Sequence, residues 1–303
     1  MLFLLYINDL HIAIKHSKVH HFANDTNLLY FGNSIKNINL KVNHDLKKLT
    51  NWLNANKICL NVSKTELVLY KSRKKTMDFE LKIKLNGKKI YETDSVKYLG
   101  IKIDKNLLWN DHINNVAVKL NKANAMLSKI RHYVDFKTLK LIYHAIFESH
   151  LYYSSLVWAQ NANSIKRLYI LQKKALRIMY FLKRSSHTGP LFKESGLLKL
   201  FDKISLENCT FINNSLNSRL PSVFHNWFTL ISESHEHNTR LSEVGCLKTP
   251  HYNTKTYGRY SVIVNAVYNW NFYQKLYKET LLHTLKKTAL KKILLQHFRS
   301  KYY

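Results

Sequence analysis

The stretch HHFANDTNLLY, at residues 20–30, places the polar pair Asn24-Asp25 between two short apolar arms. Asn and Asp side chains bond to their own backbone and tolerate unusual dihedral angles, so the pair is typical of a tight β-hairpin turn. A second interpretation is that the pair is an altered catalytic turn. The rest of the chain is needed to choose between the two.

The composition predicts a folded and strongly basic protein. The chain has 303 residues, enough for one large or two moderate domains, and 46% of them are hydrophobic, which excludes a disordered tail. The 48 Lys and Arg residues against 19 Asp and Glu residues give a net charge of +29. A basic face of this strength most often meets nucleic acid, and an anionic membrane is the weaker alternative.

The cysteines and histidines do not indicate a metal site or a disulfide framework. Cys59, Cys209 and Cys246 are too far apart for a zinc-ligand pair or a secreted disulfide pattern, which favours a reducing environment in the nucleus or cytoplasm over secretion. The 16 histidines, including His235 and His237, show no zinc-ligand spacing. We therefore expect non-metal roles for them.

The opening sequence MLFLLYINDL is apolar but short. It lacks a basic segment and a small-residue cleavage site, so it is predicted to be neither a signal peptide nor a membrane span. We expect a buried helix whose front is missing. No other apolar run reaches the ~18 residues of a transmembrane helix.

Residues 1–105 show the pattern of an α+β domain. Beyond the first hairpin, an amphipathic helix is predicted from apolar residues at steps of four, three and four: Val42, Leu46, Leu49 and Leu53. Strand signals follow at residues 58–60 and 67–70. The sequence LKIKLNGKKI alternates up to Asn86-Gly87, a strong hairpin signal. A single further strand is predicted at residues 96–103.

Residues 106–185 show a helical period instead. Asp111 is predicted to cap the first helix and Asp135 the second. The apolar stripe of the third helix is formed by Leu168, Leu171, Ala175, Ile178 and Leu182. Opposite this stripe lie seven basic residues: Lys166, Arg167, Lys173, Lys174, Arg177, Lys183 and Arg184. The pattern weakens over residues 186–303, where only residues 272–303 are again predicted to be helical.

Six blocks of the chain, taken in order, resemble the reverse transcriptase of non-LTR retrotransposons, especially the jockey-like group. Four of them are LFLLYINDL, FANDTNLLY, LNVSKTELVLY and SVKYLGIKID. The later stretch IKRLYILQKKALRIM is similar to the basic helix that follows the thumb, and TYGRYSVIVNAVYNWN is similar to the C-terminal segment. The resemblance spans roughly residues 1–270. It implies a partial polymerase palm at 1–105, a helical thumb at 106–185 and a mainly helical C-terminal segment at 186–303.

The resemblance implies a metal site at the FAND turn. In the family this turn reads Phe-Ala-Asp-Asp, and its first Asp binds both catalytic Mg²⁺ ions, because two hard cations need anionic oxygen ligands. Asn24 stands at that position, and its neutral amide lowers metal affinity. Asp25 matches the second Asp and is expected to be a vestigial ligand. The family's other metal-binding Asp lies on a strand upstream of Met1, so we expect no productive Mg²⁺ binding and no polymerase activity from this chain alone.

The resemblance also implies sites for nucleotide and nucleic acid. Lys64 matches the motif D lysine near the incoming triphosphate, and the alternative is an exposed lysine at a strand start. Tyr98, Leu99 and Gly100 match the hairpin block that supports the primer end, and the alternative for Gly100 is a strand bulge. On the thumb helix, Lys166, Arg167, Lys173, Lys174 and Arg177 would follow the backbone of a template–primer duplex.

Three hypotheses remain open on the sequence alone. The first is an inactive reverse-transcriptase fragment with residual RNA or DNA binding, whose palm could be completed by another protein of the element. The second is a non-catalytic nucleic-acid-binding protein derived from a mobile element. The third is a helical protein that binds a membrane surface or a partner. The five tryptophans do not interleave with the basic clusters, so we expect them in the core.

Overall fold

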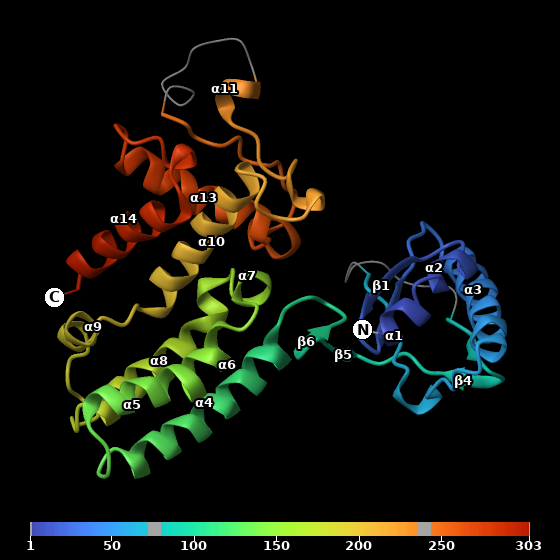
Figure 1. Cartoon of the computed structure of the whole chain (residues 1–303), viewed down its shortest axis with the longest axis horizontal. Helices are drawn as coiled ribbons and strands as arrows, with labels where there is room; N and C mark the ends of the chain where they lie inside the picture. The colour runs from blue at the N-terminus through green and yellow to red at the C-terminus, as the bar shows by residue number, and fades with distance from the viewer. Residues whose placement is uncertain (1, 72–79, 235–243, 303) are drawn as a thin grey trace. The chain divides into compact units, whose positions relative to one another are not determined.

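The computed structural model describes residues 2–71, 80–234 and 244–302, and it divides the chain into two compact units, Met1–Leu107 and Leu108–Tyr303 (Figure 1). His235 and His237 lie outside the described residues. The architecture is α+β and mostly helical, with small antiparallel sheets of two strands each. Within the described residues, no helix combines the length and the apolar character needed to cross a bilayer.

Within its described residues, the first unit contains three separate hairpins and one long helix. Its elements, in chain order, are α1 (Leu2–Tyr6), α2 (Leu10–Ala13), β1 (Lys18–Phe22), β2 (Asp25–Leu29), α3 (Ile35–Ala55), η1 (Val62–Lys64), β3 (Ile83–Leu85), β4 (Lys88–Ile90), β5 (Ser95–Tyr98) and β6 (Ile101–Asp104).

Helix α3 carries the core of this unit, as its apolar period predicts. The four predicted inward residues are all buried: Val42, Leu46, Leu49 and Leu53. They pack with apolar residues of β3 and β4, which form the predicted hairpin at Asn86-Gly87. The side chains of Asn39 and Asn43 bond to the backbone of Lys82 and Lys84 at 2.8–3.1 Å. Helix α3 therefore satisfies one edge of β3 where no third strand pairs with it.

Several predictions for the first unit are wrong. Residues 96–103 form the hairpin β5–β6 rather than one strand, because Leu99 and Gly100 both have positive φ, 46° and 81°. Residues 58–60 form no strand, and residues 67–70 contribute only an isolated bridge from Leu67 to Glu92. The opening segment is not a buried helix, since a turn separates α1 from α2 and Leu5 is 70% exposed.

The second unit is helical within its described residues. Its elements are α4 (Asn110–Ile130), α5 (Phe136–Tyr143), the π-turn η2 (His144–Glu148), α6 (Ser149–Tyr152), α7 (Ser155–Trp158), α8 (Ala162–Met179), α9 (Gly189–Ser195), α10 (Leu200–Leu216), η3 (Ser222–Phe224), α11 (Ile231–Ser234), η4 (Lys255–Arg259), α13 (Val262–Leu276), η5 (Leu282–Thr284) and α14 (Lys287–Ser300). Helix α8 packs along α4, and α10 packs on α13 and α14 (Figure 1).

The cap and boundary predictions have mixed outcomes. Asp135 caps α5, since its Oδ1 accepts the Thr138 N–H at 3.0 Å. Asp111 does not cap α4 but lies in its first turn, after Trp109 at the N-cap position. Residues 272–303 are not one helix, because α13 ends at Leu276 and α14 begins at Lys287. Leu182 lies beyond the end of α8 and is 42% exposed.

One apolar core runs through the whole second unit. It includes residues of α4 and α8 as well as residues of α10, α13 and α14. The prediction that tryptophans serve the core is confirmed, because Trp158 and Trp270 are fully buried and the other three pack against a core while partly exposed: Trp52, Trp109 and Trp227. The assignment of residues 106–185 and 186–303 to a thumb and a C-terminal segment stays a prediction.

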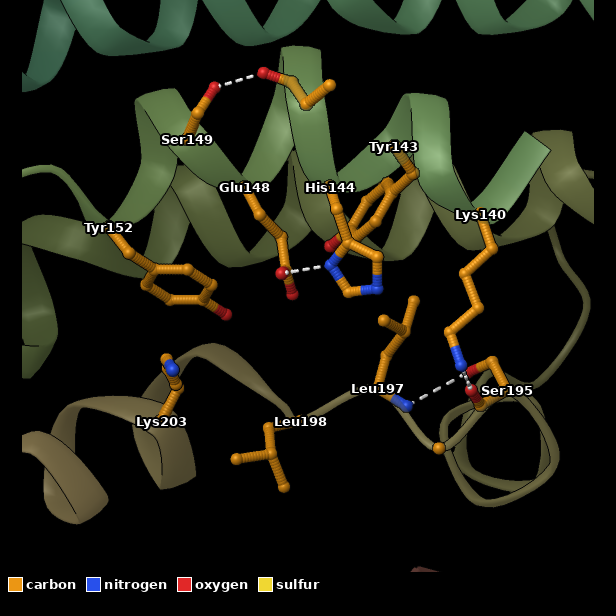
Figure 2. A network of polar contacts seen from close by, with 12 residues as sticks. Lys140, Tyr143, His144, Glu148, Ser149, Tyr152, Ser195, Leu197, Leu198 and Lys203 are labelled. Atoms are coloured by element: carbon orange, nitrogen blue, oxygen red, sulfur yellow. Dashed lines mark hydrogen bonds and ion pairs between the residues drawn. The ribbon is translucent and has the colours of Figure 1, made fainter. Parts of the chain in front are cut away.

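A polar network ties α5, η2 and α6 to the segment around α9 and the start of α10 (Figure 2). Lys140 Nζ donates to the Ser195 carbonyl at 2.5 Å, and His144 Nδ1 contacts Glu148 Oε2 at 2.5 Å across the π-turn. Behind this surface, the buried Gln172 Nε2 of α8 donates to the hydroxyls of Tyr143 and Tyr152. Burial raises the pKa of both phenols, so they stay neutral hydrogen-bond partners.

The Gln172 amide also bonds to the start of α10. Its Nε2 donates to the Leu198 carbonyl at 3.0 Å, and its Oε1 accepts the Leu200 N–H at 2.9 Å. A single side chain therefore joins three parts of the unit.

We predict that Gln172→Leu lowers the free energy of unfolding by about 2–4 kcal/mol, because leucine cannot replace the two N–H groups and the carbonyl oxygen that the amide shares among its four partners. Lys174→Ala, an exposed change on the same helix, should alter it by less than about 0.5 kcal/mol. Urea unfolding followed by near-ultraviolet circular dichroism measures both. Equal transition midpoints for the two variants would contradict this role of Gln172.

Candidate functional site

The first candidate feature is the hairpin of β1 and β2. Its register pairs Phe22 with Asp25, so the two-residue loop is Ala23-Asn24, and Ala23 has a φ of 51°. The predicted hairpin is confirmed, but its loop lies one residue earlier than the Asn24-Asp25 pair. Asp25 is the first residue of β2, and Asn24 and Asp25 are both exposed.

The resemblance implies a degenerate site for two Mg²⁺ ions at this loop. Among the described residues, no group of three or more His, Cys, Asp or Glu side chains that could hold a metal includes Asp25. A pair of hard cations needs several anionic oxygens, and Asn24 supplies a neutral one. Nearby, His21 Nδ1 lies 3.1 Å from Thr26 Oγ1. Burial, and then the charges of His11 and His20, lower the pKa of His21.

The other predicted residues of the first unit lie on separate elements. Lys64 is exposed at the end of the 3-10 turn η1, not at a strand start. Tyr98 ends β5, and the loop to β6 is Leu99-Gly100, so Gly100 serves a hairpin turn rather than a bulge. No hydrogen bond or ion pair in the described part of the chain joins Lys64 to Asp25.

The second candidate feature is the outer side of α8. We call its five predicted residues the α8 basic face: Lys166, Arg167, Lys173, Lys174 and Arg177. At 3.6 residues per turn they fall within an arc of about 120°. The opposite side of the helix is buried and carries Ile165, Leu168, Gln172, Ala175, Leu176 and Met179. The structure therefore brings all five basic residues together on one surface of one helix.

Neighbouring groups hold part of this face in place. Arg167 donates to Asn114 Oδ1 of α4 at 2.9 Å, and Arg177 Nε donates to the Ser186 carbonyl at 2.8 Å. Lys173 Nζ lies 4.9 Å from the centroid of the Tyr169 ring. None of the five forms an ion pair with a carboxylate within the described residues, and α8 itself contains no Asp or Glu. Their charge is therefore available to a ligand.

An aromatic group at the C-terminal end of α8 was not predicted from the sequence. The Arg131 guanidinium lies 4.6 Å from the centroid of the Phe181 ring and donates to the Ile178 carbonyl at 3.1 Å. The ring of His132 meets the same Phe181 edge-on at 5.2 Å. Phe181 is 56% exposed. We call Arg131, His132 and Phe181 the stacking group. The sequence does show Phe181 close to the basic residues Lys183 and Arg184, which could have suggested this group. Its contact with Arg131 and His132, however, depends on tertiary packing.

The structure groups the predicted residues by unit. Asn24, Asp25, Lys64 and the loop at Leu99-Gly100 belong to the first unit, and the α8 basic face belongs to the second. Each is therefore interpreted within its own unit.

Comparison with known proteins identifies a distant relative. The chain is 26% identical over 212 residues to "RNA-directed DNA polymerase from mobile element jockey" of Drosophila melanogaster. The alignment covers 67% of this chain and 23% of that protein, so the chain spans less than two thirds of the relative's length. No family model matches the chain, and no solved structure matches it. The chain is thus a distant homologue of an RNA-directed DNA polymerase from a mobile element.

Proposed function

We propose that the chain binds the phosphate backbone of an RNA template or an RNA–DNA duplex through the α8 basic face, and that it does not catalyse DNA synthesis by itself. The observation that carries the proposal is the α8 basic face: five basic side chains on one side of a helix, without an ion-pair partner in the described residues. The homology to a polymerase acting on RNA supports the choice of ligand.

The physical reason is counterion release. Each phosphate that a Lys or Arg side chain neutralises releases condensed cations, and this gain does not depend on base sequence. Contacts of this kind position a duplex without reading it. The net charge of +29 favours fast encounter with any polyanion. The α8 basic face then determines where on the protein the polyanion is bound.

The stacking group adds a second kind of contact. An exposed aromatic ring beside a guanidinium offers an unpaired base a surface on which to stack, and such stacking tolerates any base. Because Arg131 is held against Phe181 by its bond to Ile178, the pair is ordered before a ligand arrives. We propose that this group binds the single-stranded part of the template, next to the duplex.

The lack of catalysis is argued from the hairpin. Asn24 replaces an anionic ligand with a neutral one, and no cluster of three or more His, Cys, Asp or Glu side chains among the described residues includes Asp25. We assign residues 1–105 to a partial palm, in which Lys64 and the block Tyr98-Leu99-Gly100 descend from nucleotide-binding and primer-supporting elements. Residues 106–185 then correspond to a thumb and residues 186–303 to a C-terminal segment. The alternative function is a non-catalytic nucleic-acid-binding protein derived from a mobile element.

The first prediction concerns the α8 basic face. The triple variant Lys166→Gln, Arg167→Gln, Lys174→Gln should weaken binding of a primed RNA–DNA duplex by at least about tenfold and lower the salt slope by about 2–3. Fluorescence anisotropy at several salt concentrations measures both. The matched control is Lys36→Gln, Lys47→Gln, Lys48→Gln, which removes the same charge from exposed positions of α3.

Equal losses in the two triple variants would contradict a localised interface. Binding to anionic vesicles that the α8 variant weakens, without binding to the duplex, would favour the membrane hypothesis instead.

The second prediction concerns the stacking group. Phe181→Ala should weaken binding of single-stranded RNA by about 5-fold to 100-fold, as expected for the loss of one base stack of about 1–3 kcal/mol. Binding of a blunt duplex should hardly change. Phe31→Ala is the matched control, because Phe31 is 64% exposed and Lys18 Nζ lies 5.7 Å from its ring centroid. A loss of duplex and single-strand binding by equal factors would show that Phe181 does not stack on bases.

The third prediction concerns the hairpin. The full chain with Mg²⁺ or Mn²⁺ should add no nucleotide to a primed RNA template. Asn24→Asp should strengthen Mn²⁺ binding at the hairpin, seen as stronger paramagnetic broadening of residues 22–27, because it adds one carboxylate. Extension by the unchanged chain that disappears in Asp25→Ala would refute the lack of catalysis while leaving the proposal for α8 intact.

A further inference from the structure

Three side chains that could hold a metal ion lie close together in the first unit. They are His16, in the segment that leads into β1, and His44 and Asp45 of α3. Each offers one ligand atom, and these atoms all lie within 4.8 Å of one another. The sequence predicted non-metal roles for the histidines, because His16 and His44 are far apart along the chain and form no spaced motif.

Asp45 is the fixed part of this cluster. Its side chain is fully buried, and its Oδ2 accepts the backbone N–H groups of His16 at 2.9 Å and Ser17 at 3.1 Å. Its Oδ1 accepts a longer bond, 3.4 Å, from the Lys15 N–H. These bonds hold the segment before β1 against α3. The second contact of Oδ1 is with His44 Nδ1 at 3.2 Å, and a metal ion bound between these two atoms would replace it.

The spacing of two of the atoms already suits a metal ion. His44 Nδ1 lies 3.2 Å from Asp45 Oδ1. Around a tetrahedral Zn²⁺ with bonds of about 2.0–2.1 Å, neighbouring ligand atoms are about 3.3 Å apart. The His16 and His44 rings have centroids 5.2 Å apart at an angle of 66°. The His16 side chain is exposed, so it can rotate to bring its nitrogen into the same range.

The charge balance of the cluster also favours a cation. Among the described residues, the ion-pair partner of Asp45 is His44. This partner carries a positive charge only when its imidazole is protonated. A divalent ion would neutralise the buried carboxylate directly.

We propose that His16, His44 and Asp45 bind one divalent transition-metal ion, with Zn²⁺ as the best match, and that water completes its shell on the exposed side. Two imidazoles and one carboxylate suit Zn²⁺ and similar ions, whereas Mg²⁺ prefers oxygen ligands alone. Since His16 comes two residues before β1 and the other two ligands lie on α3, the ion would fasten the base of the hairpin to the main helix of the unit. The inference does not depend on the proposed function.

The test is Zn²⁺ binding by the full chain, measured by competition with a chromophoric chelator. His235→Gln and His237→Gln are introduced into every sample, so that these two histidines, which lie close together in the sequence, contribute no binding. The chain should bind one Zn²⁺ at least about 100-fold more tightly than its His16→Ala variant, because one of three protein ligands is lost. His20→Ala, an exposed histidine of β1, is the matched control and should bind as the unchanged chain does.

A second readout does not depend on whether the variant folds. In the unchanged chain, one equivalent of Zn²⁺ should shift the imidazole nuclear magnetic resonance signals of His16 and His44, and millimolar Mg²⁺ should not. Equal Zn²⁺ affinity in the His16→Ala and His20→Ala variants would overturn the proposal. So would imidazole signals of His16 and His44 that do not respond to Zn²⁺.

Discussion

The packing of α8 against α4 is the constraint on which the interpretation of the second unit depends. The inner side of α8 carries apolar residues and one amide, Gln172, whose four hydrogen bonds tie it to the α5–α6 region and to α10. Asn124 of α4 donates to the Leu171 carbonyl, and Arg131, the residue that follows α4, donates to the Ile178 carbonyl. With its inner side fixed in this way, α8 can present its basic side only outward. Amphipathic packing therefore both stabilises the unit and places its basic residues on one outer surface, where we propose that a polyanion binds.

In the first unit, the predicted hairpin is present, but its loop carries an amide where the resemblance implies a carboxylate. The β1–β2 hairpin keeps the shape that the resemblance predicts, and Phe22 and Asp25 close its loop. The resemblance implies an anionic ligand where this loop has Asn24, and the three potential ligands around the buried Asp45 lie at the base of the same hairpin. Asp45 bonds to the backbone before β1, whereas no hydrogen bond within the described residues involves the Asn24 side chain, so the hairpin does not need an Asp at that position.

Local patterns predicted the elements whose inner sides are mostly apolar. Helix α3 and the Asn86-Gly87 hairpin were found because period and turn chemistry agree there. The β5–β6 hairpin was missed because its loop begins with Leu99, a residue that rarely adopts positive φ. Helix α10 was missed because its buried side includes polar residues, Asn208 and Asn213 among them, which hide the apolar period. The α8 basic face needed only helical spacing, whereas the stacking group and the His16 cluster depend on contacts between distant segments.

The central claim is that nucleic acid contacts the outer side of α8, and the most direct measurement is photocrosslinking. An RNA–DNA duplex with a 4-thiouridine-containing single-stranded template extension would be crosslinked to the full chain, and the attachment sites would be identified by mass spectrometry. The account predicts attachment to residues 166–181 and to Arg131 or His132, and loss of attachment as the salt concentration rises. Attachment confined to the first unit, or to α14 with its own basic residues, would contradict it.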